Sequence, residues 1–128
     1  MLGQTLDRIC AVALLCAGTS SAAVADTFGG VRYDGRTDEL VITMHYRGTN
    51  PDHDFTVNWG ACKDPGPGST LRQISATVLD SQWNDAARAS FDKTIRVSLA
   101  AAPCRPAHVT LRTAPRFYVA VDIPARTS

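Results

Sequence analysis

The chain of 128 residues is poor in the residue types from which most active sites are built. Glu39 is its only glutamate, so the paired carboxylates of a glycosidase are hard to assemble. The sequence has no Gly-rich phosphate loop, no dinucleotide-binding Gly pattern and no Gly-x-Ser-x-Gly elbow. It also has no cluster of Lys and Arg with interleaved aromatic residues, which argues against a nucleic-acid partner. We therefore expect no cofactor and no catalytic residues.

Metal-ligand spacing is absent as well, since no His-x-His, His-x-x-x-His or Cys-x-x-Cys arrangement occurs. The alternative that stays open is a periplasmic metal-binding protein, most specifically a copper carrier that uses His45, His53 and Met44. Strand alternation argues against it, because neighbouring positions of a strand point to opposite faces. Met44 should then face the core while His45 faces solvent. We predict no metal site.

Long apolar runs are confined to the N-terminus. Arg8 precedes the run Ile9–Ala17, and small residues then lead to Ala23-Val24-Ala25. This order matches a secretory signal peptide, residues 1–25, cleaved after Ala25. The run is about half of the roughly 20 residues that a membrane span needs. We therefore predict a periplasmic or secreted protein without a stable membrane span after cleavage; the alternative is an uncleaved N-terminal anchor.

Residues 26–128 have the length of one domain with a modest core. Cys62 and Cys104 are the two cysteines that remain after cleavage. In an oxidising compartment, two cysteines without a nearby histidine pair most simply form one disulfide. Such a bond closes a loop of about 40 residues, which corresponds to about 4 kcal/mol in the chain-entropy model.

Two-residue alternation of apolar and polar residues dominates this domain and predicts strands rather than helices. Seven short strands with Gly- and Pro-rich turns indicate a small antiparallel β-sandwich, with a small β-barrel as the alternative. The one expected helix is short and covers Asn84–Ser90. The expected strands are Thr27–Tyr33, Leu40–Arg47, Asp54–Trp59, Leu71–Leu79, Ile95–Leu99, Val109–Thr113 and Phe117–Ile123.

The second and third of these strands are predicted to form a hairpin. Matching their apolar faces pairs Tyr46 with Phe55, and continues along both strands to Met44 with Val57 and Ile42 with Trp59. The same register places Arg47 opposite Asp54, a favourable cross-strand pair.

The last two strands are predicted to form another hairpin. A two-residue turn would set apolar positions against polar ones, whereas an odd loop centred on Pro115 aligns Leu111 with Val119 and Val109 with Val121. We therefore expect a loop of three or five residues.

Charge is divided unevenly along the chain, although the formal net charge is only +1. Residues 26–65 carry an excess of acidic side chains, and residues 91–128 carry an excess of basic ones. In a β-sandwich these two segments interleave, so the separation should largely disappear in space.

Contact residues are expected in the loops at the ends of the sandwich. The densest polar cluster, Asp52-His53-Asp54, suits either a histidine oriented by a carboxylate or a simple turn, and we favour the turn. Trp83, with Arg88 nearby, is typical of an interface anchor, although we favour a Trp83 that folds back over the sandwich. Arg112, Arg116 and Tyr118 form a second candidate surface.

Taken together, these features predict an exported, non-catalytic binding or interaction protein whose partner is another envelope protein or a host protein. The contacts would come from three loops, Thr49–His53, Ser81–Arg88 and Ala114–Arg116. An enzyme with a dispersed site is the remaining alternative.

Overall fold

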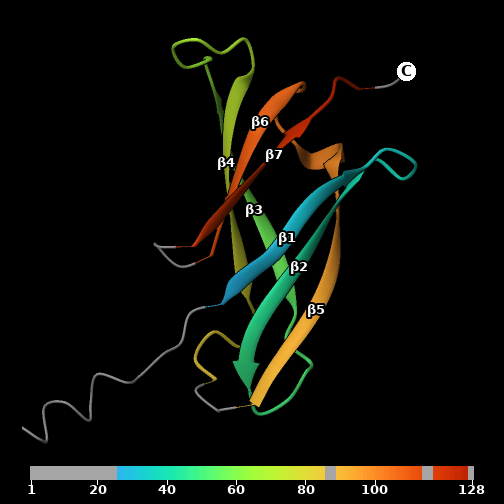
Figure 1. Ribbon diagram of the computed structural model, residues 1–128, viewed down its shortest axis with the longest axis vertical. Helices are drawn as coiled ribbons and strands as arrows, with labels where there is room; N and C mark the ends of the chain where they lie inside the picture. Colours follow the sequence, from blue (N-terminus) through green and yellow to red (C-terminus); the bar gives the residue numbers. More distant parts are fainter. Residues whose placement is uncertain (1–25, 86–88, 114–116, 127–128) are drawn as a thin grey trace, which may run out of the picture.

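The structure is a computed structural model that describes residues 26–85, 89–113 and 117–126. Its strands form two sheets with the orders β1-β2-β5 and β3-β4-β6-β7 (Figure 1). The strands are β1 (Thr27–Asp34), β2 (Glu39–Gly48), β3 (Phe55–Lys63), β4 (Arg72–Asp80), β5 (Ala89–Ser98), β6 (Ala107–Arg112) and β7 (Tyr118–Ile123). The predicted β-sandwich is confirmed. One detail differs, because β4 and β6 pair in parallel while the other neighbours are antiparallel.

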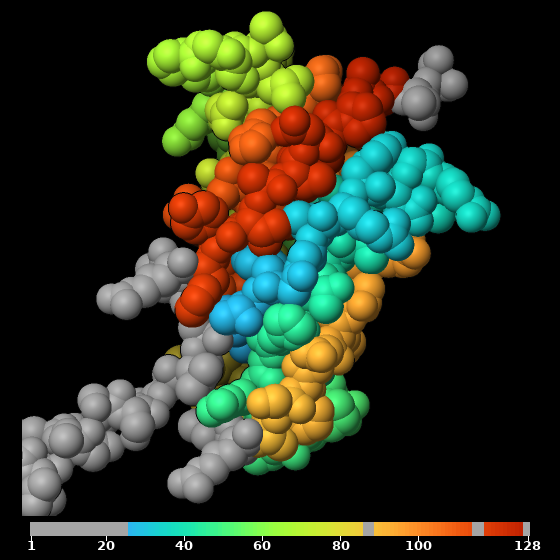
Figure 2. Space-filling view, viewed as in Figure 1, coloured from blue at the N-terminus to red at the C-terminus, as the bar shows by residue number. Residues whose placement is uncertain are grey.

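The two sheets stay separate, so the alternative of a closed barrel does not apply. They come closest along β1 and β7, which lie side by side without sharing a ladder (Figures 1 and 2). Between the sheets lies the core, filled by the apolar residues of the alternating strands, since every second side chain points inward. The buried side chains include Leu40, Ile42, Met44, Ile74, Ala76, Val78, Val109 and Leu111.

The predicted hairpin of the second and third strands is wrong. β2 pairs with β1 and β5, whereas β3 pairs with β4 in the other sheet. The six residues 49–54 are long enough to carry the chain across the sandwich, whereas a two-residue turn would have forced a hairpin. The apolar faces still meet, because the rings of Tyr46 and Phe55 lie 5.1 Å apart across the interior.

The charge pair predicted for that hairpin is wrong for the same reason. Arg47 lies opposite Ser90 of β5. Asp54 instead lies 3.6 Å from the ammonium of Lys93, also on β5. Asp54 therefore does have a cationic neighbour, but this neighbour is Lys93 of β5 rather than Arg47 of β2.

The second hairpin has the predicted register. Leu111 lies opposite Val119 and Val109 opposite Val121. Arg112 and Tyr118 form the last pair, so the loop has five residues, one of the two predicted lengths. Matching of apolar faces therefore suffices where the connection is short.

The predicted helix Asn84–Ser90 is wrong at both of its ends, and its residues 86–88 lie outside the described residues. Asn84 belongs to a turn, and Ala89 and Ser90 are the first residues of β5, opposite Gly48 and Arg47. Pairing along the whole of β2 outweighs the local helix preference of a short alanine-rich segment. Among the described residues the helical structure is the 3₁₀ turn Leu99–Ala101, and no helix there has the length and hydropathy to cross a membrane.

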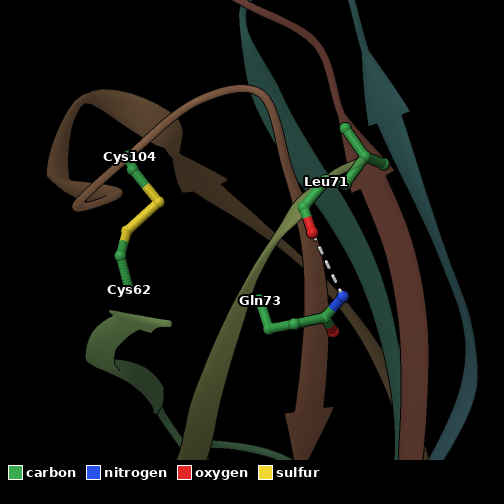
Figure 3. The surroundings of a disulfide bond; sticks show 4 residues. All are labelled: Cys62, Leu71, Gln73 and Cys104. Atoms are coloured by element: carbon green, nitrogen blue, oxygen red, sulfur yellow. Dashed lines mark hydrogen bonds between the residues drawn. A yellow bond between two sulfur atoms is a disulfide. The ribbon is translucent and has the colours of Figure 1, made fainter. Parts of the chain in front are cut away.

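A disulfide joins Cys62, near the end of β3, to Cys104, just before β6, as predicted (Figure 3). A β-bulge between Trp59 and Cys62 makes this possible, because it shifts the alternation and brings Cys62 onto the inward face that Trp59 occupies. Gly60 within the bulge is required by space, since a Cβ there would lie 2.5 Å from the carbonyl oxygen of Ser75. The disulfide therefore depends on the bulge, which turns Cys62 inward.

Ion pairs join the acidic N-terminal half of the domain to its basic C-terminal half. Arg96 lies 3.0 Å from Asp34 and 3.2 Å from Glu39. The buried guanidinium of Arg105 donates two hydrogen bonds to Asp38, at 2.8 and 2.7 Å. These ion pairs show that charges of the two segments interleave in space at Arg96 and Arg105.

Candidate functional site

Two loops meet at one end of the sandwich and are tied together by hydrogen bonds. Thr49–Asp54 connects β2 to β3, and Ser81–Asp85 follows β4; we call these two segments the loop end. The side-chain amide of Asn50 donates to that of Gln82 at 3.0 Å, and the Gln82 amide donates to the Asp52 carbonyl at 3.2 Å. Two more bonds join Ser81 and Asp54 through their backbones and the Ser81 hydroxyl. The loop end is therefore one braced unit.

A buried histidine occupies the centre of this unit. His53 is 0% exposed. Its Nδ1 lies 2.8 Å from the buried carboxylate of Asp80, at the end of β4. Its Nε2 lies 3.1 Å from a carboxylate oxygen of Asp85, at the far side of the turn. An imidazole can donate from both nitrogens only when it is protonated, so this geometry fits an imidazolium.

The surroundings of His53 are closely fitted. The ring of Tyr46 packs against the imidazole at 4.8 Å between centroids. The Lys93 ammonium donates to the His53 carbonyl at 2.8 Å. Gly48 leaves the necessary space, because a Cβ there would lie 2.4 Å from Nε2 of His53 and 2.6 Å from the Asp85 carboxylate. The histidine is therefore held from the ring face, the backbone and both nitrogens.

The pKa values of two groups in this cluster, His53 and Asp26, are raised above their ordinary values. Burial alone would lower the pKa of His53, but the hydrogen bonds to Asp80 and Asp85 outweigh it, so the pKa is raised. Burial and a side-chain hydrogen bond with Asp80 raise the pKa of Asp26 to about 7, and the charge of His53 offsets only part of this rise. Protons on His53 and Asp26 are therefore favoured below neutral pH.

Trp83 projects from the turn that this cluster supports. It is 79% exposed, so it does not fold back over the sandwich, which was the favoured expectation. Two hydrogen bonds close the turn. The backbone N–H of Asp85 donates to the backbone carbonyl of Gln82 at 3.0 Å, and the backbone N–H of Gln82 donates to the Asp80 carboxylate at 2.9 Å. A large apolar side chain is thus exposed to water on a hydrogen-bonded turn.

The other predicted contact residues have different places. Asp52 is exposed on the loop end, whereas His53, beside it in sequence, is buried and does not reach the surface. Arg88 and Arg116 lie outside the described residues, as does the third predicted contact loop, residues 114–116.

The second candidate surface lies where β7 begins. Tyr118 is 72% exposed and lies opposite Arg112. An open hollow of about 330 Å³ separates the start of β7 from β1, and Phe28, Gly29 and Tyr118 are among the residues that line it.

All three histidines, among them His45 and His53 of the copper-carrier alternative, are engaged by carboxylates. The Nδ1 of His45 bonds to Asp92, and the Nδ1 of His108 lies 2.6 Å from Asp122. Within residues 26–85, 89–113 and 117–126, no group of three or more His, Cys, Asp or Glu side chains is arranged to hold a metal ion. Met44 is buried and His45 exposed, as alternation predicted.

The buried cluster was missed from sequence, although one signal was available. Ile74, Ala76 and Val78 alternate on the inward face of β4, and the same alternation places Asp80 inward. A carboxylate at a core position requires a hydrogen-bonded or cationic partner, because burying an unpaired charge is costly. Nothing in the local sequence identifies His53 as that partner, since it lies 27 residues away.

Fold and loop end together define a small disulfide-linked β-sandwich that carries a braced, tryptophan-bearing turn. Comparisons with protein-family models, with curated proteins and with solved structures found no match to this chain.

Proposed function

We propose that this protein is an exported, non-catalytic binding module that contacts a protein partner through the loop end, with Trp83 as the central contact. The observation that carries the proposal is the 79% exposure of Trp83 on a hydrogen-bonded turn. Tryptophan is enriched among the residues that dominate binding energy. Holding it in place before binding lowers the entropy cost of forming a complex.

The surroundings of His53 support a structural role rather than a catalytic one. Both ring nitrogens face carboxylates at 2.8 and 3.1 Å, and the side chain is fully buried. A general base needs a free nitrogen within reach of the substrate proton. The cluster instead fixes the turn that presents Trp83.

Export places the partner outside the cytoplasm, so we propose another envelope protein or a host protein. This part of the proposal is supported by the predicted signal peptide, residues 1–25, and by the Cys62–Cys104 disulfide, which is typical of oxidising compartments.

Site-specific photo-crosslinking in the native host tests the contact. A benzophenone amino acid replaces Trp83 in one variant and Leu79 in the control. Leu79 is a suitable control because it is also exposed, at 49%, but lies on the outer face of β4. A third variant carries the probe at Tyr118. We expect a discrete crosslinked protein from position 83 and none from position 79.

The crosslinked protein is then tested directly. Purified partner should bind the wild type and the Leu79→Ala variant equally, and bind Trp83→Ala at least tenfold more weakly, as expected for a central contact. Crosslinks from position 118 alone would move the binding surface to β7. Equal affinity of all three proteins would remove Trp83 from the interface.

A further inference from the structure

We propose that His53, Asp80, Asp85 and Asp26 form a proton-operated latch that fixes the Trp83 turn, and that the turn loosens when the cluster loses its protons. The inference concerns the regulation of the loop end and takes its biological meaning from the proposed binding function. Its physical basis is independent of any partner.

The latch follows from the positions of its two carboxylates. Asp80 and Asp85 stand immediately before and after the four residues 81–84, and each binds a different nitrogen of the same imidazole. The His53 ring therefore clamps both ends of the turn that carries Trp83. A neutral imidazole has one N–H, so deprotonation turns one of the two hydrogen bonds into a contact between a lone pair and a carboxylate.

The contact that breaks is the one to Asp85. Asp80 is more deeply buried, with 4% of its side chain exposed against 12% for Asp85. Asp85 also accepts hydrogen bonds from the amide and hydroxyl of Thr49, at 2.7 and 3.0 Å, so it remains bonded when it loses His53. Asp80 would also keep its bond from the Gln82 backbone amide, but its deeper burial makes the loss of the imidazole N–H more costly there. The remaining proton therefore stays on Nδ1, and the turn loses its tie to His53 at Asp85 while the hydrogen bonds from Thr49 to Asp85 remain.

Charged groups face the latch from several elements. Asp80 and Asp85 approach from β4 and its turn, and Asp26 approaches from the start of β1. From β5, the Lys93 ammonium contacts the His53 carbonyl and lies 3.6 Å from Asp54. Asp80 and Asp85 thus contact the imidazole, Asp26 interacts with it electrostatically, and the Lys93 ammonium lies on its backbone side. In the cleaved protein the α-amino group of Asp26 adds a second cation to this end of the sandwich. The two direct carboxylate contacts favour the imidazolium.

The sign of the pH dependence follows from the two raised pKa values. A pKa that is higher in the folded than in the unfolded chain means that folding favours the bound proton. The contribution of Asp26 to the stability of the folded state is complete below pH about 4 and is lost as pH rises to about 7. That of His53 is complete below pH about 6.5 and is lost as pH rises through its raised pKa. The latch therefore opens on alkalinisation.

Two NMR observables on the full folded domain test the latch without a partner. ¹⁵N labelling of histidine reports whether each imidazole nitrogen is protonated. Incorporation of 5-fluorotryptophan gives separate ¹⁹F signals for Trp83 and for Trp59, which packs against the core. From pH 5 to 10 we expect the ¹⁹F signal of Trp83 to shift with the same midpoint as His53, above pH 6.5, while Trp59 stays constant.

Matched variants separate the latch from ordinary surface titration. Asp85→Asn keeps an acceptor but removes one charge, so the His53 midpoint should fall by about one pH unit, and the Trp83 midpoint should follow it. His108→Gln, which alters a surface pair on β6, should move neither. A neutral His53 at pH 6, or a Trp83 signal that ignores the His53 titration, overturns the latch. Either result leaves the crosslinking experiment free to succeed or fail independently.

Discussion

Substitution of Gly48 by alanine is the sharpest test of the buried cluster. The added Cβ would lie 2.4 Å from Nε2 of His53 and 2.6 Å from the carboxylate of Asp85, both far inside van der Waals contact. His53 cannot retreat easily, because it is fully buried, bonded to Asp80 and packed against Tyr46. The strain is relieved by separating His53 from Asp85, which breaks the 3.1 Å bond between them.

The expected cost follows from that bond. A hydrogen bond between charged groups contributes about 1.5–3 kcal/mol. Replacing glycine with alanine also restricts the unfolded chain, which stabilises the folded state by about 0.4–1 kcal/mol. The net loss for Gly48→Ala is therefore about 0.5–2.5 kcal/mol. In a domain of this size, it lowers the melting temperature by roughly 2–20 °C.

Thermal unfolding at pH 6, followed by circular dichroism with the disulfide intact, measures this loss. Gly66→Ala is the matched control, because a Cβ there meets nothing within 4 Å. The control should melt at the wild-type temperature or slightly above it. The double variant Gly48→Ala/Asp85→Asn should lose less stability than the two single variants lose in total, because both substitutions weaken the same hydrogen bond. A Gly48→Ala variant that melts with the Gly66→Ala control would refute the assigned role of Gly48.

Three other predictions follow from the described geometry. Replacing both Cys62 and Cys104 with serine should destabilise the domain by about 4 kcal/mol, measured by urea unfolding, because their separation of 42 residues sets the size of the closed loop. Hydrogen bonds from Arg105 lower the pKa of Asp38 to about 2, so this pair stabilises the fold above pH about 4 and fails as pH falls through 2; Asp38→Asn should remove this acid-sensitive contribution in melts between pH 2 and 5. N-terminal sequencing of the protein recovered from the periplasm or medium should begin at Asp26, and a start at the initiating methionine would refute cleavage.

Alternation predicted most of the strands because it reports which face of a strand is apolar. It also gave the β6–β7 register, since a short loop leaves adjacent strands little choice of partner. It could not give the partner of β2. An apolar face can be covered by a neighbouring strand's side chains or by the opposite sheet, and the pattern is the same in both cases.

The candidate site shows the same limit. The sequence identified Trp83 and the loops around it, but not their relative arrangement. The exposure of Trp83 depends on a turn held by His53. The partners of His53, Asp80 and Asp85, lie 27 and 32 residues further along the chain. Such contacts depend on the crossing of β2 and β3 between sheets, which no local pattern encodes.

The bulge in β3 gives oxidation a role in selecting the native pairing. If β3 and β4 paired without the extra residue, alternation would turn the Cys62 thiol toward solvent, away from Cys104. The cystine closes readily only in chains whose strands are correctly aligned. Its formation should therefore trap the native alignment and leave misaligned chains with reactive thiols open to further exchange.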